Sequence, residues 1–131
     1  MKVLIAEDDF TSRLVLQTFL SRYGECRTAV NGREAVEAFQ TAADARAPFD
    51  LICMDIHMPE MDGKEAVKQI RAIEESTGIF SDRGAKIIMT TTLDDMKEVI
   101  RSFQALCDVY LFKPIDTAEL LGHLRHFKLT A

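Results

Sequence analysis

Four short apolar runs, each followed directly by a polar or charged residue, constrain the fold of this chain more than any other feature. The runs cover residues 3–6, 51–54, 87–89 and 109–112. Segments with helical spacing of apolar residues separate them, and such alternation is typical of a parallel sheet covered by helices. The run at 51–54 is apolar throughout, as expected for a central strand with helices on both faces. We therefore predict an α/β fold.

Five strand–helix units account for the whole chain. The predicted strands are 2–6, 27–30, 51–54, 86–90 and 109–112, and the predicted helices are 11–23, a segment after Asn31-Gly32 that ends before Pro48, 63–75, 94–103 and 117–127. In the first helix, Leu14, Val15, Phe19 and Leu20 form the predicted inward face, with Thr11 or Ser12 as the N-cap. Residues 76–84 contain two glycines and have no clear period, so we predict a long exposed loop there.

Length and composition limit the class of protein. A chain of 131 residues, 47% apolar and 28% charged, fits one globular domain, so we expect a single domain over residues 1–131 and no output domain. A formal charge of −5 argues against nucleic-acid binding, which needs a basic patch. No run approaches the roughly 18 apolar residues of a membrane span. Three cysteines without a CxxC pair favour reduced thiols. We expect a cytoplasmic monomer or weak dimer with no membrane or nucleic-acid partner.

Polar side chains follow the strands where each predicted strand ends. They are Asp8, Asp9, Asp55, Thr91 and Lys113. The carboxyl ends of parallel strands share one edge of the sheet, so these side chains meet in one crevice. Carboxylates suit a hard divalent cation such as Mg²⁺, while an ammonium and a hydroxyl suit phosphate oxygens. Alone, an Asp-Asp pair is weak evidence, because such pairs commonly cap helices or lie in solvated turns.

The complete set of motifs resembles the receiver domain of two-component response regulators. The matching segments, in order and spacing over the whole chain, are Glu7-Asp8-Asp9, Met54-Asp55, Met58-Pro59-Glu60-Met61-Asp62-Gly63, Thr91 and Lys113-Pro114. The resemblance implies a flavodoxin-like, doubly wound sheet of five parallel strands in the order 2-1-3-4-5 with five helices.

The resemblance also implies a phosphorylation site. Asp55 would accept a phosphoryl group from a phosphohistidine on a sensor histidine kinase or a phosphotransfer protein. Asp8, Asp9 and Asp55 would hold Mg²⁺ together with the backbone carbonyl of His57. Lys113, joined to Pro114 by a cis peptide bond, would pair with a phosphoryl oxygen.

The same resemblance implies a conformational switch. Thr91 would donate its hydroxyl to the phosphoryl group, and Tyr110 would change rotamer as the loop after the fourth strand moves. A downstream target protein would read the face formed by the fourth helix, the fifth strand and the fifth helix. Such a protein catalyses only its own Mg²⁺-dependent phosphorylation and dephosphorylation.

Two alternatives belong to other classes. Haloacid-dehalogenase-like phosphatases and mutases also form an aspartyl phosphate, but they carry a second aspartate two residues after the nucleophile, where this chain has His57. A degenerate receiver would bind partners without phosphorylation. Degenerate receivers usually lose an acidic-pair residue, the acceptor or the lysine, and this chain keeps all of them, so we favour the phosphorylation switch.

Overall fold

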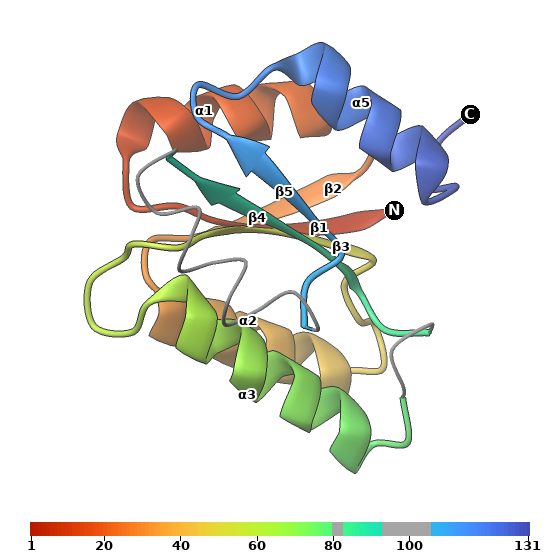
Figure 1. Cartoon of the computed structure of the whole chain (residues 1–131). Helices are drawn as coiled ribbons and strands as arrows, with labels where there is room; N and C mark the ends of the chain where they lie inside the picture. The colour runs from red at the N-terminus through yellow and green to blue at the C-terminus, as the bar shows by residue number, and fades with distance from the viewer. Residues whose placement is uncertain (80–82, 93–105) are drawn as a thin grey trace.

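A five-stranded parallel sheet forms the centre of the protein. The structure, a computed structural model, describes residues 1–79, 83–92 and 106–131. The strands are β1 (Lys2–Ala6), β2 (Glu25–Ala29), β3 (Leu51–Asp55), β4 (Lys86–Thr91) and β5 (Val109–Phe112), arranged in the order β2-β1-β3-β4-β5 (Figure 1). The predicted fold class and strand order are confirmed.

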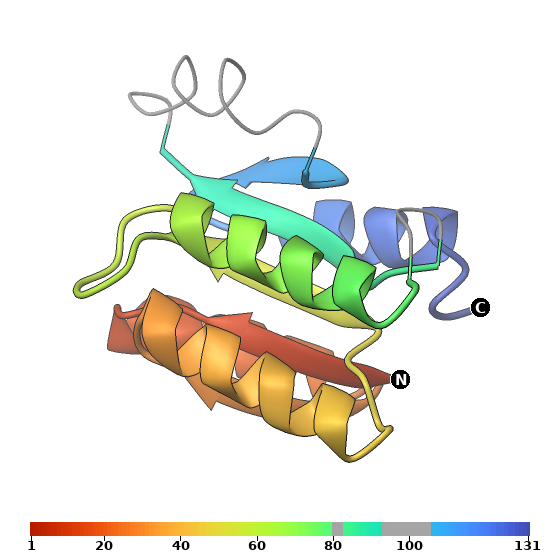
Figure 2. The ribbon, with the colours of Figure 1, turned by 90° about the horizontal axis from the view of Figure 1, so that it is seen from below.

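Helices cover both faces of the sheet. The helices of the described residues are α1 (Phe10–Leu20), α2 (Gly32–Asp44), α3 (Gly63–Ser76) and α5 (Thr117–His126). Helices α1 and α5 lie on one face, and α2 and α3 lie on the other (Figures 1 and 2). The predicted helix at 94–103 lies outside the described residues. None of the helices that the structure describes has the length and apolarity to cross a membrane.

Two apolar cores result from the alternation of side chains along the strands. Leu4 and Ala6 of β1 face α2 and α3, where they join a cluster that contains Phe39. Val3 and Ile5 point to the opposite face and pack in a second cluster with the buried leucines of α1 and α5. All five residues of β3 are buried, as predicted for the middle strand.

The first helix differs from its prediction in its start and in its buried face. It begins at Phe10, and its N-cap is Asp9 rather than Thr11 or Ser12. Leu16 and Leu20 are its buried residues, whereas Leu14 and Val15 are 48% and 42% exposed, so the predicted inward face was wrong at these two positions. Because residues 14–16 are all apolar, spacing alone did not decide which of them faces the sheet.

Acidic and amide side chains cap the described helices and fix the turns at the carboxyl edge of the sheet. The N-caps of α1, α2, α3 and α5 are Asp9, Asn31, Asp62 and Asp116. In each case the side-chain oxygen accepts a hydrogen bond from a backbone N–H of the first turn. Such a cap contributes about 1 kcal/mol. The loops that carry the candidate site therefore have defined exits into helices.

Candidate functional site

The site lies where β1, β3 and β5 end. Asp55 is the last residue of β3, while Glu7 and Lys113 directly follow β1 and β5. Glu7 continues the strand geometry, because its N–H donates to the carbonyl of Ala29 at 3.0 Å. The Glu7 side chain is fully buried, and Asp55 is 5% exposed. Two carboxylates from neighbouring strands are thus held in a largely dry crevice.

Lys113 connects these two carboxylates. Its Nζ lies 2.6 Å from Oε1 of Glu7 and 3.2 Å from Oδ1 of Asp55. Burial alone would lower the pKa of the Lys113 ammonium, but the hydrogen bond to Glu7 and the charge of Asp55 outweigh it, so the pKa is raised. The lysine therefore stays charged. The Lys113–Pro114 peptide bond is cis, as the resemblance implied.

Ionisation of Asp55 is unfavourable even though Lys113 lies beside it. Burial, followed by the hydrogen bond and negative charge of Glu7, raises the pKa of Asp55 from 3.8 to about 7, while Lys113 opposes the shift. One ammonium does not balance two buried carboxylates and a third nearby. An added cation at this position would favour the ionised form of Asp55.

Three carboxylates are close enough to share such a cation. One oxygen each from Glu7, Asp8 and Asp55 lies within 4.8 Å of the others. Hard divalent cations prefer oxygen ligands, and Mg²⁺ is commonly held by one or two carboxylates while it retains several waters. Asp8 is exposed to solvent and the other two are buried, so the cluster opens to water on one side. The donor set and its charge fit Mg²⁺.

Asp9, predicted as a ligand, is not a member of this cluster among the described residues. Its Oδ2 accepts the N–H of Ser12 at 2.9 Å, and this backbone hydrogen bond is the main reason that the pKa of Asp9 is lowered. The structure brings Asp8 and Asp55 together as predicted, and adds Glu7, which sequence reasoning quoted in the motif but did not assign. Glu7 follows four buried residues of β1, and this position was the feature of the sequence that could have assigned it to the site.

The loop after β3 is fixed against Asp55. The N–H of Gly63 donates to the carbonyl of Ile56 at 2.8 Å. A Cβ on Gly63 would lie 2.1 Å from the Asp55 carbonyl oxygen, so only glycine fits there. Asp62 caps α3 immediately before it. The Met58-to-Gly63 motif thus ends in a cap and a close backbone approach, both of which hold Asp55 at the mouth of the crevice.

The predicted switch residues, Thr91 and Tyr110, and the predicted metal ligand His57 differ in how deeply they are buried. Thr91 ends β4 and is buried, and its hydroxyl donates to the carbonyl of Thr92 at 3.1 Å. Tyr110 packs against the cluster on the α2 and α3 face, and burial raises the pKa of its hydroxyl. The side chain of His57 is exposed. The roles of Thr91 and Tyr110 in switching and of the His57 carbonyl in metal binding stay predictions.

The chain and its architecture are similar to known proteins. Residues 3–125 match the response regulator receiver domain family, and the chain belongs to that family. It is 31% identical over 125 residues to the chemotaxis protein CheY of Thermotoga maritima, covering 94% of this chain and 93% of that protein. It is 33% identical to the sensory/regulatory protein RpfC of Xanthomonas campestris over 95% of this chain but spans only 16% of RpfC.

Solved structures support the same assignment. A co-crystal structure of the Saccharomyces cerevisiae histidine phosphotransfer protein Ypd1 with the receiver domain of Ssk1 matches with a TM-score of 0.79 at 29% identity, covering 97% of this chain and 88% of that chain. The chemotaxis protein CheY4 of Vibrio cholerae matches with a TM-score of 0.70 at 30% identity, covering 96% of this chain and 97% of that chain.

Proposed function

We propose that this receiver domain is a phosphorylation switch in which Asp55 accepts a phosphoryl group from a phosphohistidine. The observation that carries the proposal is the position of Lys113, which contacts Asp55 and Glu7 together beside a three-carboxylate cluster. A carboxylate oxygen of Asp55 attacks phosphorus, the phosphorus–nitrogen bond breaks, and the imidazole of the donor leaves. Lys113 would pair with a phosphoryl oxygen as a compact charge.

Glu7, Asp8 and Asp55 are the residues proposed to hold Mg²⁺, with the His57 carbonyl as a further ligand. When bound, Mg²⁺ neutralises charge on the phosphoryl oxygens during transfer. The chain's own contribution is preorganisation, because β1, β3 and β5 hold the carboxylates and Lys113 in place before any phosphoryl group arrives. Thr91 and Tyr110 are the proposed switch residues, and they would bias the surface that a target protein reads.

The phosphodonor is proposed to be a sensor histidine kinase or a phosphotransfer protein. Support comes from the exposed apolar side chains at the start of α1, where Phe10 is 67% and Leu14 48% exposed. These residues are four apart and lie on one helix face, directly after the acidic segment. The receiver domain of Ssk1 was solved with a phosphotransfer protein, which supports the same class of partner here.

We further propose a cytoplasmic, stand-alone receiver whose output is a target protein that binds the face of β5, α5 and the helix predicted at 94–103, which lies outside the described residues. The Thermotoga CheY, matched over 93% of its length, supports a stand-alone organisation. The free thiols of Cys26, Cys53 and Cys107 agree with a reducing compartment. The alternative, a degenerate receiver that binds partners without phosphorylation, is disfavoured because Asp55, Lys113 and the acidic cluster are all present.

Intact-mass analysis after incubation with acetyl phosphate tests the proposal. We expect one added phosphoryl group that requires Mg²⁺ and that is absent in Asp55→Asn. The matched control is Asp44→Asn, which removes an exposed carboxylate of α2 and should be phosphorylated like the parent protein. No adduct in the folded parent protein would favour the phosphorylation-independent alternative.

A further inference from the structure

A cavity of about 400 Å³ lies at the opposite edge of the sheet from Asp55. It is formed where α2 and α3 end and where β3 and β4 begin, together with Leu129 after α5. Asp50 lies at this edge and Asp55 at the other end of β3, roughly 16 Å away at 3.3 Å per residue. The volume is within the range of small-molecule sites. The cavity is therefore a site separate from the acidic crevice.

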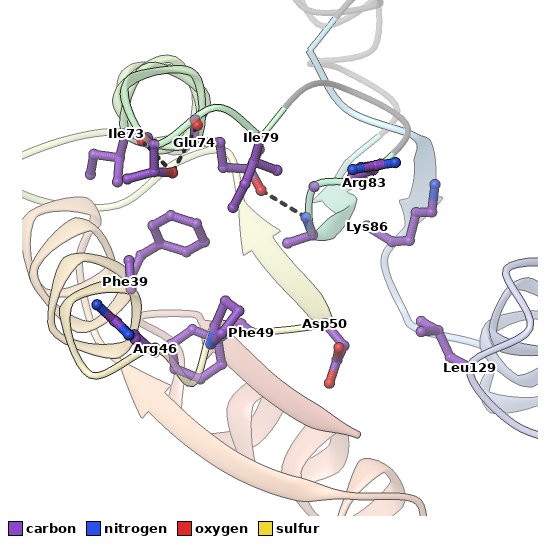
Figure 3. Close-up of a pocket in the computed structure, with 15 residues that line it drawn as sticks. Phe39, Arg46, Phe49, Asp50, Ile73, Glu74, Ile79, Arg83, Lys86 and Leu129 are labelled. Atoms are coloured by element: carbon purple, nitrogen blue, oxygen red, sulfur yellow. Dashed lines mark hydrogen bonds between the residues drawn. The ribbon is translucent and has the colours of Figure 1, made fainter.

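The walls of the cavity are largely apolar. Phe39 and Phe49 line it from the side of α2, and Ile73 and Ile79 line it from the side of α3 (Figure 3). The two phenylalanine side chains are also part of the protein core, with Phe39 2% and Phe49 3% exposed, so their positions are fixed. Rigid aromatic side chains of this kind favour a flat or aliphatic apolar group.

The described residues that line the cavity carry a net positive formal charge. Arg46, Arg83 and Lys86 line it, and neither arginine has an ion-pair partner among the described residues (Figure 3). The two lining carboxylates, in contrast, already have partners. Oδ2 of Asp50 accepts the N–H of Lys2 at 2.8 Å, while Glu74 pairs with Arg71 at 2.7 Å and accepts the N–H of Ala85 at 2.7 Å.

Arg46 belongs to the turn that ends α2. It has a φ of 56°, and the N–H groups of Arg46 and Ala47 donate to the carbonyls of Ala43 and Ala42 at 3.0 and 2.9 Å, which is a common way for a helix to end. The ammonium of Lys86 lies over the ring of Phe127, 5.7 Å from its centroid. The ends of α2 and α3 each contribute about half a negative charge, which the two arginine charges together exceed.

We propose that this cavity binds an apolar organic carboxylate, with its hydrocarbon part against the apolar wall that includes Ile73 and Ile79 and its carboxylate at Arg46 and Arg83. An apolar wall alone would accept neutral molecules equally well. Arg46 and Arg83, for which the described residues offer no ion-pair partner, make the anion the preferred form, because charge-assisted hydrogen bonds from guanidinium groups to carboxylate are strong and directional. The site requires neither phosphorylation nor a metal ion.

Nuclear magnetic resonance titration of the full chain tests this inference with two probes of the same shape, 2-naphthoate and its uncharged amide, 2-naphthamide. We expect saturable shifts at the amides of Phe49, Ile79 and Ala85, and binding of the carboxylate at least about tenfold tighter than that of the amide. Because the titration contains no phosphodonor and no Mg²⁺, its outcome is independent of the proposed phosphorylation.

Two kinds of variant locate the binding. Ala43→Phe and, separately, Thr77→Phe fill the cavity from α2 and α3 and should abolish binding of both probes while the spectrum stays dispersed. Arg46→Gly combined with Arg83→Gln should weaken naphthoate about tenfold and leave naphthamide unchanged. The control, Arg22→Gln with Arg27→Gln, makes the same charge change at exposed positions outside the cavity and should have no effect.

Several results would overturn the inference. Equal affinity for the two probes would show that the cations do not select an anion. Unchanged binding in both filling variants would place the ligand elsewhere. An equal loss in the control pair would reduce the effect to net charge, and the absence of saturation at millimolar probe would show that the cavity takes no such ligand.

Discussion

Oε1 of Glu7 lies 2.6 Å from Nζ of Lys113, closer than Oδ1 of Asp55, which lies at 3.2 Å. Glu7, the residue that directly follows β1, is therefore the closer of the two carboxylates to Lys113. This contact makes Glu7, rather than a residue further along the loop, a direct determinant of the charge around Asp55. Two pairs of carboxylates could join Asp55 in holding a cation, namely Glu7 with Asp8 or Asp8 with Asp9, and this contact favours the first pair.

Separate substitutions of Glu7 and Asp9 show which of the two pairs holds the cation. Glu7→Gln should weaken Mg²⁺ binding by about tenfold or more, because a carboxylate of the cluster becomes neutral. Asp9→Ser keeps an N-cap for α1 and should change the affinity little. Isothermal titration with Mg²⁺ measures both. A larger loss in Asp9→Ser than in Glu7→Gln would restore Asp9 as the ligand.

The pKa of Asp55 predicts how stability depends on pH without metal. Since the pKa is about 7 in the folded protein and 3.8 in the reference state, the folded protein binds more protons between these values. The free energy of unfolding should therefore fall as pH rises through this window, by on the order of 2 to 4 kcal/mol.

Urea titrations at pH 4.5 and pH 7.5 measure this difference. Saturating Mg²⁺ should reduce it, because the cation favours the ionised carboxylate, and Asp55→Asn should remove the contribution of this group. A slope of the same size in Asp55→Asn would assign the pH dependence to other residues.

Arg71 and Glu74 form a buried ion pair that should contribute far more to stability than an exposed one. Nη1 of Arg71 lies 2.7 Å from Glu74, and the same guanidinium donates to the carbonyls of Leu106 and Ala85. Arg71→Met leaves Glu74 buried and short of a partner, so we expect a loss of about 3 kcal/mol or more.

The exposed pair of Arg33 and Glu60, 3.2 Å apart with both side chains more than half exposed, provides the control. Arg33→Met should cost less than about 1 kcal/mol in the same urea titration. Equal losses in the two variants would mean that the buried network adds nothing beyond a surface contact.

Replacement of glycine by alanine should have opposite effects on stability at Gly63 and at Gly122. Gly63→Ala places a Cβ 2.1 Å from the Asp55 carbonyl and should destabilise the protein by about 2 kcal/mol or more while disturbing the loop at the site. In Gly122→Ala nothing lies within 4 Å of the new atom, and this exposed position of α5 should gain about 1 kcal/mol. Thermal unfolding measures both, and a stable Gly63→Ala would contradict the close approach.

The strands set by continuous apolar runs could be predicted from the sequence, whereas the features set by pairing and packing could not. The ranges of β1 and β5 match their predictions, because each apolar run has a charged neighbour that ends it. Strand β2 starts two residues earlier than predicted, at Glu25, because its pairing with Lys2 adds polar residues to the ladder. Pairing partners that are distant in sequence cannot be read from a local pattern.

The candidate site likewise contains residues that could be predicted from the sequence and residues that could not. Asp55 and Lys113 were predicted from their positions after buried runs, and the structure brings them into contact. The choice between Glu7 and Asp9 depended on where α1 begins, because Asp9 is the N-cap of that helix, and apolar spacing did not fix this start. The cavity could not be predicted at all, since it combines Phe49, Ile79 and Leu129 from three separate connections.

The complete burial of β3 has a dynamic consequence. Its neighbours β1 and β4 bond it on both edges, and both apolar clusters contain its side chains. Backbone amides in such a position exchange with solvent only when the whole domain unfolds. We therefore expect the amides of β3 to exchange among the slowest of the described residues, and any change at Asp55 to spread through side chains and loops rather than through movement of the strand itself.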